Sequence, residues 1–238
     1  NMKKTIISLL ALVFIYSCTP QDAPNTFTDN RDGKVYKTVT IGEQVWMAEN
    51  LAYLPSVVGP ATGSEDAGNE TVAFYYVYGY DGTDVAAAKA TANYSTYGVL
   101  YNWTAAMNGA ASNDANPSGV QGVCPDGWHL PSDEEWTQLA DFLGGTSVAG
   151  GKMKEAGTAH WTTPNTDATN SSGFTALPGG YRSNAGAFSG FGTNGLWWSS
   201  SQYGTSNAWF HTLYYDGSYV LRSHANKENG FSVRCVRD

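Results

Sequence analysis

The sequence predicts one turn-rich α+β domain, and three observations carry this prediction. Only 14% of the 238 residues are Asp, Glu, Lys or Arg, whereas 13% are aromatic and 27 are Gly; an average globular protein has about 25% charged residues. Short runs of alternating apolar and polar residues, typical of half-buried strands, fill the last third of the chain. One segment carries a full set of helix signals. The composition excludes a helical bundle, which needs many Glu, Lys, Leu and Ala, and a disordered chain, which has few aromatics.

The first predicted element is a β-hairpin over Lys34 to Asn50, because apolar and polar residues alternate on both sides of a turn at Gly42-Glu43. Pro55 to Thr71 is rich in Gly, Ser and Pro and is predicted to be a loop. Val72 to Tyr80 contains four Tyr and has the composition of a strand.

The middle of the chain is predicted to be loop with one short helix. Gly82 to Tyr94 is rich in Ala and Thr and fits either a loop or a short helix. Leu100 to Met107 is predicted to be helical and to end near Asn108-Gly109, where Gly favours a helix stop. Ala110 to Gln121 is a polar loop.

A capped helix is predicted over Asp133 to Leu143. Ser132 is a suitable N-cap, and Glu135 three residues later completes a capping box. The acidic first turn suits the positive end of the helix dipole, and Gly144-Gly145 supplies the stop. An apolar stripe at helical spacing is formed by Trp136, Leu139, Ala140 and Leu143.

The last third of the chain is predicted to form strands separated by Gly. Asp216-Gly217 between two alternating runs predicts a hairpin turn. The candidate strands are Phe174–Leu177, Leu196–Ser200, Asn207–Tyr215, Ser218–Ser223 and Phe231–Val236. The residues expected to be core or framework are Trp197, Ala208, Phe210, Leu213, Val220 and Phe231.

The N-terminus has the pattern of an export signal. Lys3-Lys4 precedes an apolar run from Ile6 to Tyr16 that is too short to span a bilayer. The following Ser17-Cys18 resembles the lipobox of bacterial lipoproteins, in which Cys18 is lipidated; the alternative is an ordinary secretory signal with an incidental Cys. We expect a signal peptide over residues 1–18, a polar tether over residues 19–26 and the domain over residues 27–238.

The net charge limits the kinds of binding partner, and the cysteines indicate the cellular compartment. A formal net charge of −8 offers no electrostatic footprint for nucleic acid and no polybasic patch for anionic lipid. If Cys18 carries lipid, Cys124 and Cys235 are left as a pair. Export to an oxidising compartment favours a disulfide between them; the alternative is two buried free thiols.

Six stretches in a fixed order carry a family resemblance. They are Phe27 to Tyr36, Gly42 to Leu51, Tyr97 to Trp103, Cys124 to Trp136, Trp197 to Ser200 and Gly230 to Val236. Together they closely resemble the Fibrobacter succinogenes major paralogous domain. That family is similar to formylglycine-generating-enzyme-like proteins, which share the C-type lectin-like fold. The resemblance implies small twisted antiparallel sheets, two helices, and long loops that present a surface.

The segment from Ser199 to Asn229 resembles, in addition, the C-terminal part of variable proteins of diversity-generating retroelements. In those proteins Tyr, Ser, Asn, Asp and His alternate with fixed framework residues. Tyr and Trp provide large contact area with few rotatable bonds, and Ser and Asn provide adaptable hydrogen bonds. We expect a ligand-binding face from Tyr203, Ser206, Asn207, Trp209, His211, Tyr214, Tyr215, Tyr219, Ser223, His224 and Asn226. Its ligand would be a protein or a glycan on another cell or a host surface.

The sequence does not predict an enzyme, a cofactor or a metal site. The four His residues have no metal-ligand spacing, and no Gly-x-Ser-x-Gly elbow occurs. His129 is expected to be structural. The Asp29 to Gly33 segment leads into a hairpin, where Asn and Asp are ordinary turn residues, so calcium is unsupported. An enzyme resembling the formylglycine-generating type is the lesser alternative.

We therefore expect an outer-membrane lipoprotein that is exposed on the cell surface, anchored by lipid, and acts as a non-enzymatic binding module or adhesin. The main alternative is a structural cell-surface or pilus-associated subunit. Such a subunit could assemble by strand exchange, and Thr26 to Val39 is the candidate strand.

Overall fold

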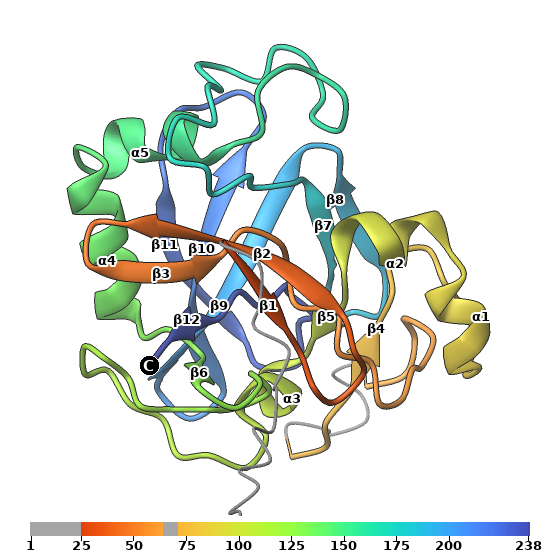
Figure 1. Ribbon diagram of the computed structural model, residues 1–238. Helices are drawn as coiled ribbons and strands as arrows, with labels where there is room; N and C mark the ends of the chain where they lie inside the picture. Colours follow the sequence, from red (N-terminus) through yellow and green to blue (C-terminus); the bar gives the residue numbers. More distant parts are fainter. Residues whose placement is uncertain (1–24, 64–70) are drawn as a thin grey trace, which may run out of the picture.

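The computed structural model describes residues 25–63 and 71–238 (Figure 1). Signal peptide and lipidation site, both predicted, lie outside these residues. The predicted α+β class is confirmed: curled, mostly antiparallel sheets are combined with short helices. Of the helices in the described ranges, none is both long and apolar enough to cross a membrane.

The first sheet has five strands and contains the predicted hairpin. Its order is β1 (Thr26–Thr28), β2 (Val35–Ile41), β3 (Gln44–Met47), β12 (Val236–Arg237) and β6 (Trp128–His129). β2 and β3 pair antiparallel from Thr38↔Met47 to Ile41↔Gln44 around a turn at Gly42-Glu43. Gly42 has φ +62°, a conformation that side chains disfavour, so the turn position needs Gly. The hairpin prediction is therefore confirmed.

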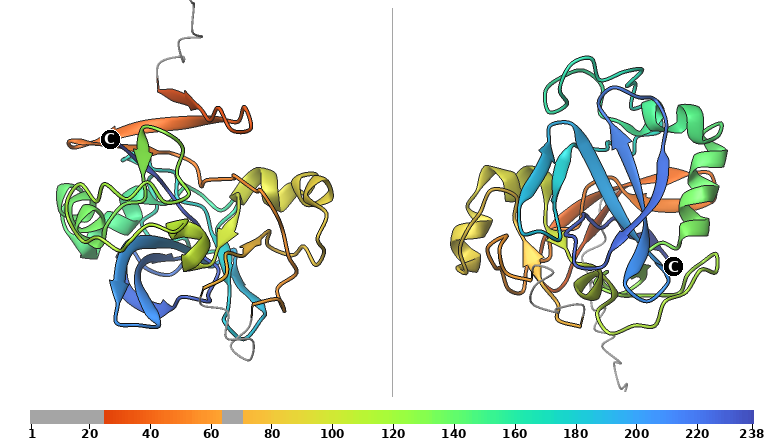
Figure 2. Two further views of the ribbon diagram at one scale, coloured as in Figure 1. Left: turned by 90° about the horizontal axis from the view of Figure 1, so that it is seen from below. Right: turned by 180° about the vertical axis from the view of Figure 1, so that it is seen from behind.

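The second sheet also has five strands and lies in a separate layer from the hairpin (Figure 2). Its order is β11 (Leu221–Asn226), β10 (Asn207–Tyr214), β9 (Asn194–Tyr203), β7 (Gly179–Arg182) and β8 (Phe188–Phe191). The pairs are antiparallel except for β7 with β9, which is parallel. A two-stranded sheet joins β4 (Tyr75–Tyr76) to β5 (Leu100–Tyr101).

The centre of the second sheet is buried on both faces, whereas its edge strands β11 and β8 are partly exposed. Along β9, Leu196 and Trp198 enter one core cluster, and Trp197 between them enters the other. The cluster on the Trp197 side also holds Trp46 and Trp136, with ring centroids 4.8 Å apart. All six residues expected to be core or framework are buried. Successive strand residues point to opposite faces, so the Trp197-Trp198 pair serves two cores at once.

Five helices occur in the described residues, not the two that the family resemblance implied. They are α1 (Val85–Lys89), α2 (Ala92–Tyr97), α3 (Trp103–Met107), α4 (Asp133–Phe142) and α5 (Thr146–Met153). α4 has the predicted capping box between Ser132 and Glu135. The predicted helix over Leu100 to Met107 begins instead as β5, because Asn102 caps the helix at its side-chain oxygen. α1 and α2 lie on the opposite side of the molecule from α4 and α5 (Figure 1).

Several strand predictions are wrong in extent, among them Ser218 to Ser223, because the strand β11 begins only at Leu221. Val72 to Tyr80 contains only the two residues of β4. Phe174 to Leu177 forms a single bridge at Ala176, because the carbonyls of Phe174 and Thr175 accept hydrogen bonds from Arg234. Phe231 to Val236 is not one strand, since it bonds in turn to Tyr101, Leu196, Leu51 and Met47 while it passes between the sheets.

The predicted tight turn at Asp216-Gly217 is a longer connection between β10 and β11. The reason is contact with α5: Ser218 O accepts from Gly151 N at 2.9 Å, and Val220 N donates to Thr146 O at 2.7 Å. A Cβ at Gly150 would lie 2.4 Å from Tyr219 O, so this close approach requires Gly.

Three buried cations bind loop carbonyls. Lys154 Nζ donates to Thr166 O, Tyr214 O and Gly217 O at 2.8–3.0 Å. Arg182 donates to Pro60 O, Thr62 O and Glu228 O at 2.8–3.0 Å. Arg234 donates to Asn50 Oδ1 and to the carbonyls of Phe174 and Thr175. Each cation thereby joins segments that no strand pairing connects.

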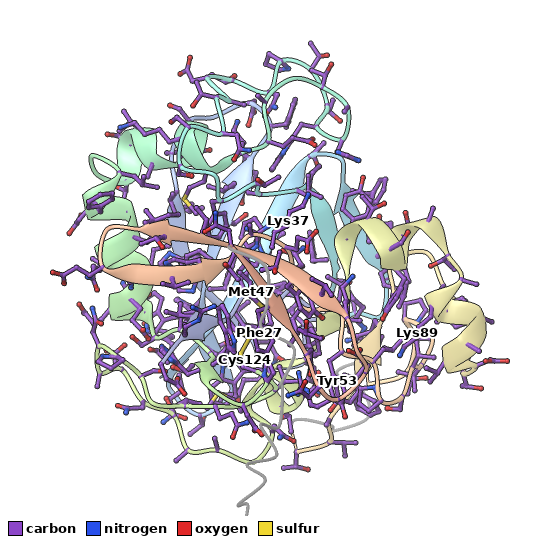
Figure 3. All side chains as sticks on the ribbon, viewed as in Figure 1. Phe27, Lys37, Met47, Tyr53, Lys89 and Cys124 are labelled. Atoms are coloured by element: carbon purple, nitrogen blue, oxygen red, sulfur yellow. A yellow bond between two sulfur atoms is a disulfide. The ribbon has the colours of Figure 1, made fainter. Side chains whose placement is uncertain are left out.

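The predicted disulfide between Cys124 and Cys235 is confirmed. It joins the segment before β6 to the segment before β12, within the core cluster that contains Met47 and Trp128. In Figure 3 the label of Cys124 lies next to that of Phe27, which packs against the same cluster.

Replacing Cys124 and Cys235 together by Ala is expected to lower the free energy of unfolding by about 4–5 kcal/mol, because the bond closes a loop with a sequence separation of 111 residues. Urea unfolding of the variant and of the reduced wild-type protein measures the effect. Unfolding midpoints equal to that of the oxidised wild type would contradict the prediction.

Candidate ligand-binding surface

The eleven residues predicted to form a binding face are not on one surface. Tyr203, Trp209 and His224 cluster at one end of the β9–β10–β11 sheet, and Tyr214, Tyr215 and Tyr219 lie at the other end of β10. His211 is buried between them. The smaller polar residues of the set are Ser206, Asn207, Ser223 and Asn226, all half-buried.

The first group forms a packed set of rings on three adjacent strands. Tyr203 stacks on His224 with centroids 3.9 Å apart and an interplanar angle of 18°. Trp209 meets Tyr203 at 4.8 Å and His224 at 5.6 Å, both edge to face. Tyr203 is 44% exposed, and none of the three rings belongs to a core cluster. We call these rings, together with Arg222, the Trp209 cluster.

A β-bulge positions Trp209. The register between β9 and β10 shifts between Ala208 and Phe210, so that extra residues of β9 lie opposite Trp209. These are the serines of the Ser199 to Ser201 run, and Ser199 Oγ donates to Trp209 O at 2.9 Å. Bulges commonly redirect a side chain at the end of a sheet, and small Ser residues leave room for this one.

Arg222 completes the cluster with a fixed positive charge. Its Cζ lies 3.5 Å from the centroid of the Trp209 ring, and its Nε and Nη2 contact Asp133 Oδ2 at 2.7 and 2.6 Å. Burial opposes the charge on Asp133, but the hydrogen bonds from His211 and Arg222 outweigh it, so the pKa of Asp133 lies below its ordinary value. The aspartate is therefore ionised and holds the guanidinium over the ring.

The prediction that His211 belongs to the binding face is wrong. His211 is buried, it stacks on Trp136 with centroids 5.1 Å apart, and its Nε2 contacts Asp133 Oδ1 at 3.0 Å. Burial lowers the pKa of His211 more than Asp133 raises it. The ring is thus a neutral support below the surface: it orients Asp133, and Asp133 orients Arg222.

The second group is less uniform. Tyr219 is 42% exposed and lies 6.1 Å from Tyr214, centroid to centroid. Tyr215 packs against the core cluster that contains Trp136 and Trp197. No cation–ring contact occurs at these Tyr residues in the described chain. Exposed area at this end comes mainly from Tyr219.

The small polar residues serve the adjoining turn and strand. Asn207 pairs with both Tyr203 and Asn226 at the strand ends. Asn226 Oδ1 accepts from Glu228 N at 2.7 Å, and Ser206 O accepts from Lys227 N at 2.9 Å. Ser223 lies opposite Phe210. These contacts support the backbone beneath the Trp209 cluster.

Two residues of this surface were not predicted from the sequence. In the sequence, the helix dipole already accounts for Asp133, and Arg222 is one residue of a candidate strand. The alternation did contain a signal, since Arg222 and His224 occupy the same face of β11 as alternate residues. The pairing with Asp133 depends on a contact 89 residues apart.

His129 is buried, as expected for a structural residue, and it contacts two carboxylates. Nε2 lies 2.7 Å from Glu135 Oε1, and Nδ1 lies 2.7 Å from Asp238 Oδ1. Burial lowers the pKa of His129, but the hydrogen bonds and charges of the two carboxylates outweigh it and raise the pKa overall. Two ionised acceptors require a proton on each ring nitrogen, so the imidazolium is favoured. In the described ranges, no three His, Cys, Asp or Glu side chains are placed to hold a metal ion.

The fold and this surface define an α+β domain with two curled sheets and an aromatic surface at one sheet end. The chain belongs to the Fibrobacter succinogenes major domain family, whose family model matches residues 39–237. This confirms the family resemblance inferred from the sequence. Comparisons with curated proteins and with solved structures found no match. The C-type lectin-like fold and the retroelement likeness stay predictions.

Histidine titration by NMR is expected to give a midpoint above 6.5 for His129 and below 6.5 for His211. The His129 contribution to stability is then present at low pH and lost as pH rises through its raised pKa. The His211 contribution is present above pH about 6.5 and lost as pH falls through its lowered pKa.

The variants His129→Gln and His211→Gln assign the two signals, and the urea-unfolded protein gives the reference midpoint. Midpoints of both residues at the unfolded value, or in the opposite order, would show that the carboxylate contacts and the burial do not act as described.

Proposed function

We propose that this protein is a non-enzymatic ligand-binding module and that the Trp209 cluster is the centre of its ligand surface. The observation that carries the proposal is Arg222 held between Asp133 and the Trp209 ring. In this arrangement the cation and the three rings of the Trp209 cluster are held in place before any ligand binds, so little side-chain entropy is lost on binding.

The residue types support a macromolecular ligand. Trp, Tyr and Arg dominate the energetic centres of protein interfaces, and all three occur here on adjacent strands. Aromatic faces also stack on sugar rings, so the ligand class is a protein or a glycan on another cell or a host surface. Asp114 and Glu134 add negative charge near Arg222, which disfavours a strongly anionic ligand such as nucleic acid.

The proposal includes export and anchoring of the protein at the outer membrane and exposure at the cell surface. The N-terminal lipobox pattern supports this localisation, and the disulfide fits an oxidising compartment. Retroelement diversification of Ser199 to Asn229 belongs to the same proposal. A reverse-transcriptase gene beside a near-copy of this coding region would support it.

The alternative, a structural or pilus-associated subunit, has one specific observation in its favour. β1 is a three-residue edge strand that pairs with β2 on one side. A strand from a neighbouring molecule could replace it, and edge strands are suited to such exchange. Polymers in solution that disappear when Thr26 to Thr28 is deleted would favour this alternative.

Alanine at Tyr203 or at Trp209 is expected to weaken binding to glycans or proteins on a printed array by about 2 kcal/mol, roughly thirtyfold, because each ring is part of the cluster. Tyr219→Ala is the matched control, since Tyr219 is 42% exposed against 44% for Tyr203 and lies at the other end of β10. Thermal unfolding checks that Tyr203→Ala remains folded.

Equal loss in Tyr203→Ala and Tyr219→Ala would contradict a localised surface. Loss in Tyr219→Ala alone would move the ligand surface to the opposite end of β10. If the wild-type protein bound neither the printed glycans nor the printed proteins, this would count against a binding module.

Cys18→Ser is expected to release the protein from the membrane fraction, because the thioether-linked lipid would be its attachment. Fractionation and immunoblotting of cells that produce each form measure the release. Thr19→Ser is the matched control, as it changes the residue next to Cys18 and keeps both the proposed lipidation site and the Cys124–Cys235 disulfide. Continued membrane attachment of Cys18→Ser would refute lipid anchoring at this residue.

A further inference from the structure

A polar cavity lies away from the Trp209 cluster, between the start of the hairpin, α2 and the loop before β7. Its volume is about 210 Å³. Both signs of charge line it: cations from Lys34, Lys37 and Arg234, and carboxylates from Glu49 and Glu155. A site of this size suits a small molecule and not a polymer chain.

The first observation that points to a ligand is the state of Arg234. Its side chain is 1% exposed, and no carboxylate in the described residues contacts the guanidinium. Of its five N–H groups, three donate to Asn50 Oδ1 and to the carbonyls of Phe174 and Thr175. Each of its three nitrogens has one acceptor, and within residues 25–63 and 71–238 the second N–H of Nη1 and that of Nη2 have none, although the residue lines the cavity.

The second observation is the backbone at Thr175, which also lines the cavity. Thr175 has φ +54°, a left-handed conformation that β-branched residues strongly disfavour. Asn170 holds it there through hydrogen bonds to its backbone N–H and its hydroxyl, at 2.8 and 3.0 Å. Strained residues of this kind concentrate at ligand sites, and this one aims its carbonyl at Arg234.

We propose that this cavity binds a small carboxylate that also carries hydrogen-bond donors, such as an acidic monosaccharide or an α-amino acid. Arg234 and Lys37 bind the carboxylate, and Glu49 and Glu155 accept from the ligand's hydroxyl or ammonium groups. The site is independent of the ligand surface proposed above.

Because Glu49 and Glu155 line the cavity, it is not suited to a simple anion. Glu155 already contacts His160 Nδ1 with both oxygens, at 2.9 and 2.8 Å, and Glu49 Oε2 accepts from Lys37 N at 3.1 Å. Each carboxylate keeps further lone pairs for a donor. A ligand with an acid at one end and donors at the other matches both halves of the cavity, whereas phosphate or sulfate would leave the glutamates unmatched.

Calorimetric titration with sodium glucuronate, L-serine and glucose tests the proposal. We expect glucuronate or L-serine to bind and glucose, which has no carboxylate, not to bind. Lys37→Ala should weaken that binding about tenfold, the effect of losing one charge-assisted hydrogen bond. Lys89→Ala is the matched control, because Lys89 lies on α1, well apart from Lys37 (Figure 3).

Glu49→Gln distinguishes the two ligand classes, an α-amino acid and an acidic monosaccharide. The amide keeps an oxygen for Lys37 N but loses the charge, so L-serine should lose affinity more than glucuronate. Arg234 itself is left unchanged in the test, because it also donates to the carbonyls of Phe174 and Thr175.

Three outcomes would overturn the proposal: no heat of binding for either acid up to about 10 mM, equal binding of glucose, or unchanged binding in Lys37→Ala. Tyr203→Ala should leave the titration unaffected, so this site and the Trp209 cluster can fail separately.

Discussion

Much of this chain lies outside helices and strands, and a dry interior then contains carbonyl oxygens that need donors. Lys154, Arg182 and Arg234 supply them, each from one buried side chain to two or three separate segments. A buried cation is costly without compensation, and here several carbonyl dipoles provide it. Burial lowers the pKa of Lys154 to about 8 and that of Arg234 to about 9.

The positions of both proposed sites follow from that arrangement. Lys154 binds the carbonyls of Tyr214 and Gly217 and so fixes the connection from β10 to β11. The β10–β11 register then places Trp209 opposite His224, and Arg222 beside Asp133. Arg234 sets the loop at Thr175, which lines the cavity. Strands β9, β10 and β11 carry the Trp209 cluster and a loop residue, Thr175, lines the cavity, and in both cases a buried cation binds the carbonyls of a neighbouring loop.

Local signals predicted the parts of the fold that local contacts determine. The hairpin at Gly42 and the capped helix α4 are specified by residues a few positions apart, and both are confirmed. Phe174 to Leu177 reads as a strand, but Arg234, some sixty residues later, takes its carbonyls. In the predicted binding face, the alternation of residues identifies the apolar core positions. It does not separate the remaining residues into those that are exposed and those that are buried in polar contacts. His211 and Tyr203 both occupy non-core positions of the alternating pattern. They differ in the structure because His211 contacts Asp133, which is 78 residues away in the sequence.

The place of β12 in the first sheet has a consequence for biosynthesis. Val236 pairs with Trp46 of β3 on one side and with His129 of β6 on the other, so the last described strand is the central link of that sheet. The two parts of the sheet cannot join until residues 236–237 have left the ribosome. Shorter chains lack this link, and chains that end before Cys235 lack the partner of Cys124. Joining of the two parts of this sheet therefore requires residues 236–237, and fragments that lack them are expected to be substrates for proteases.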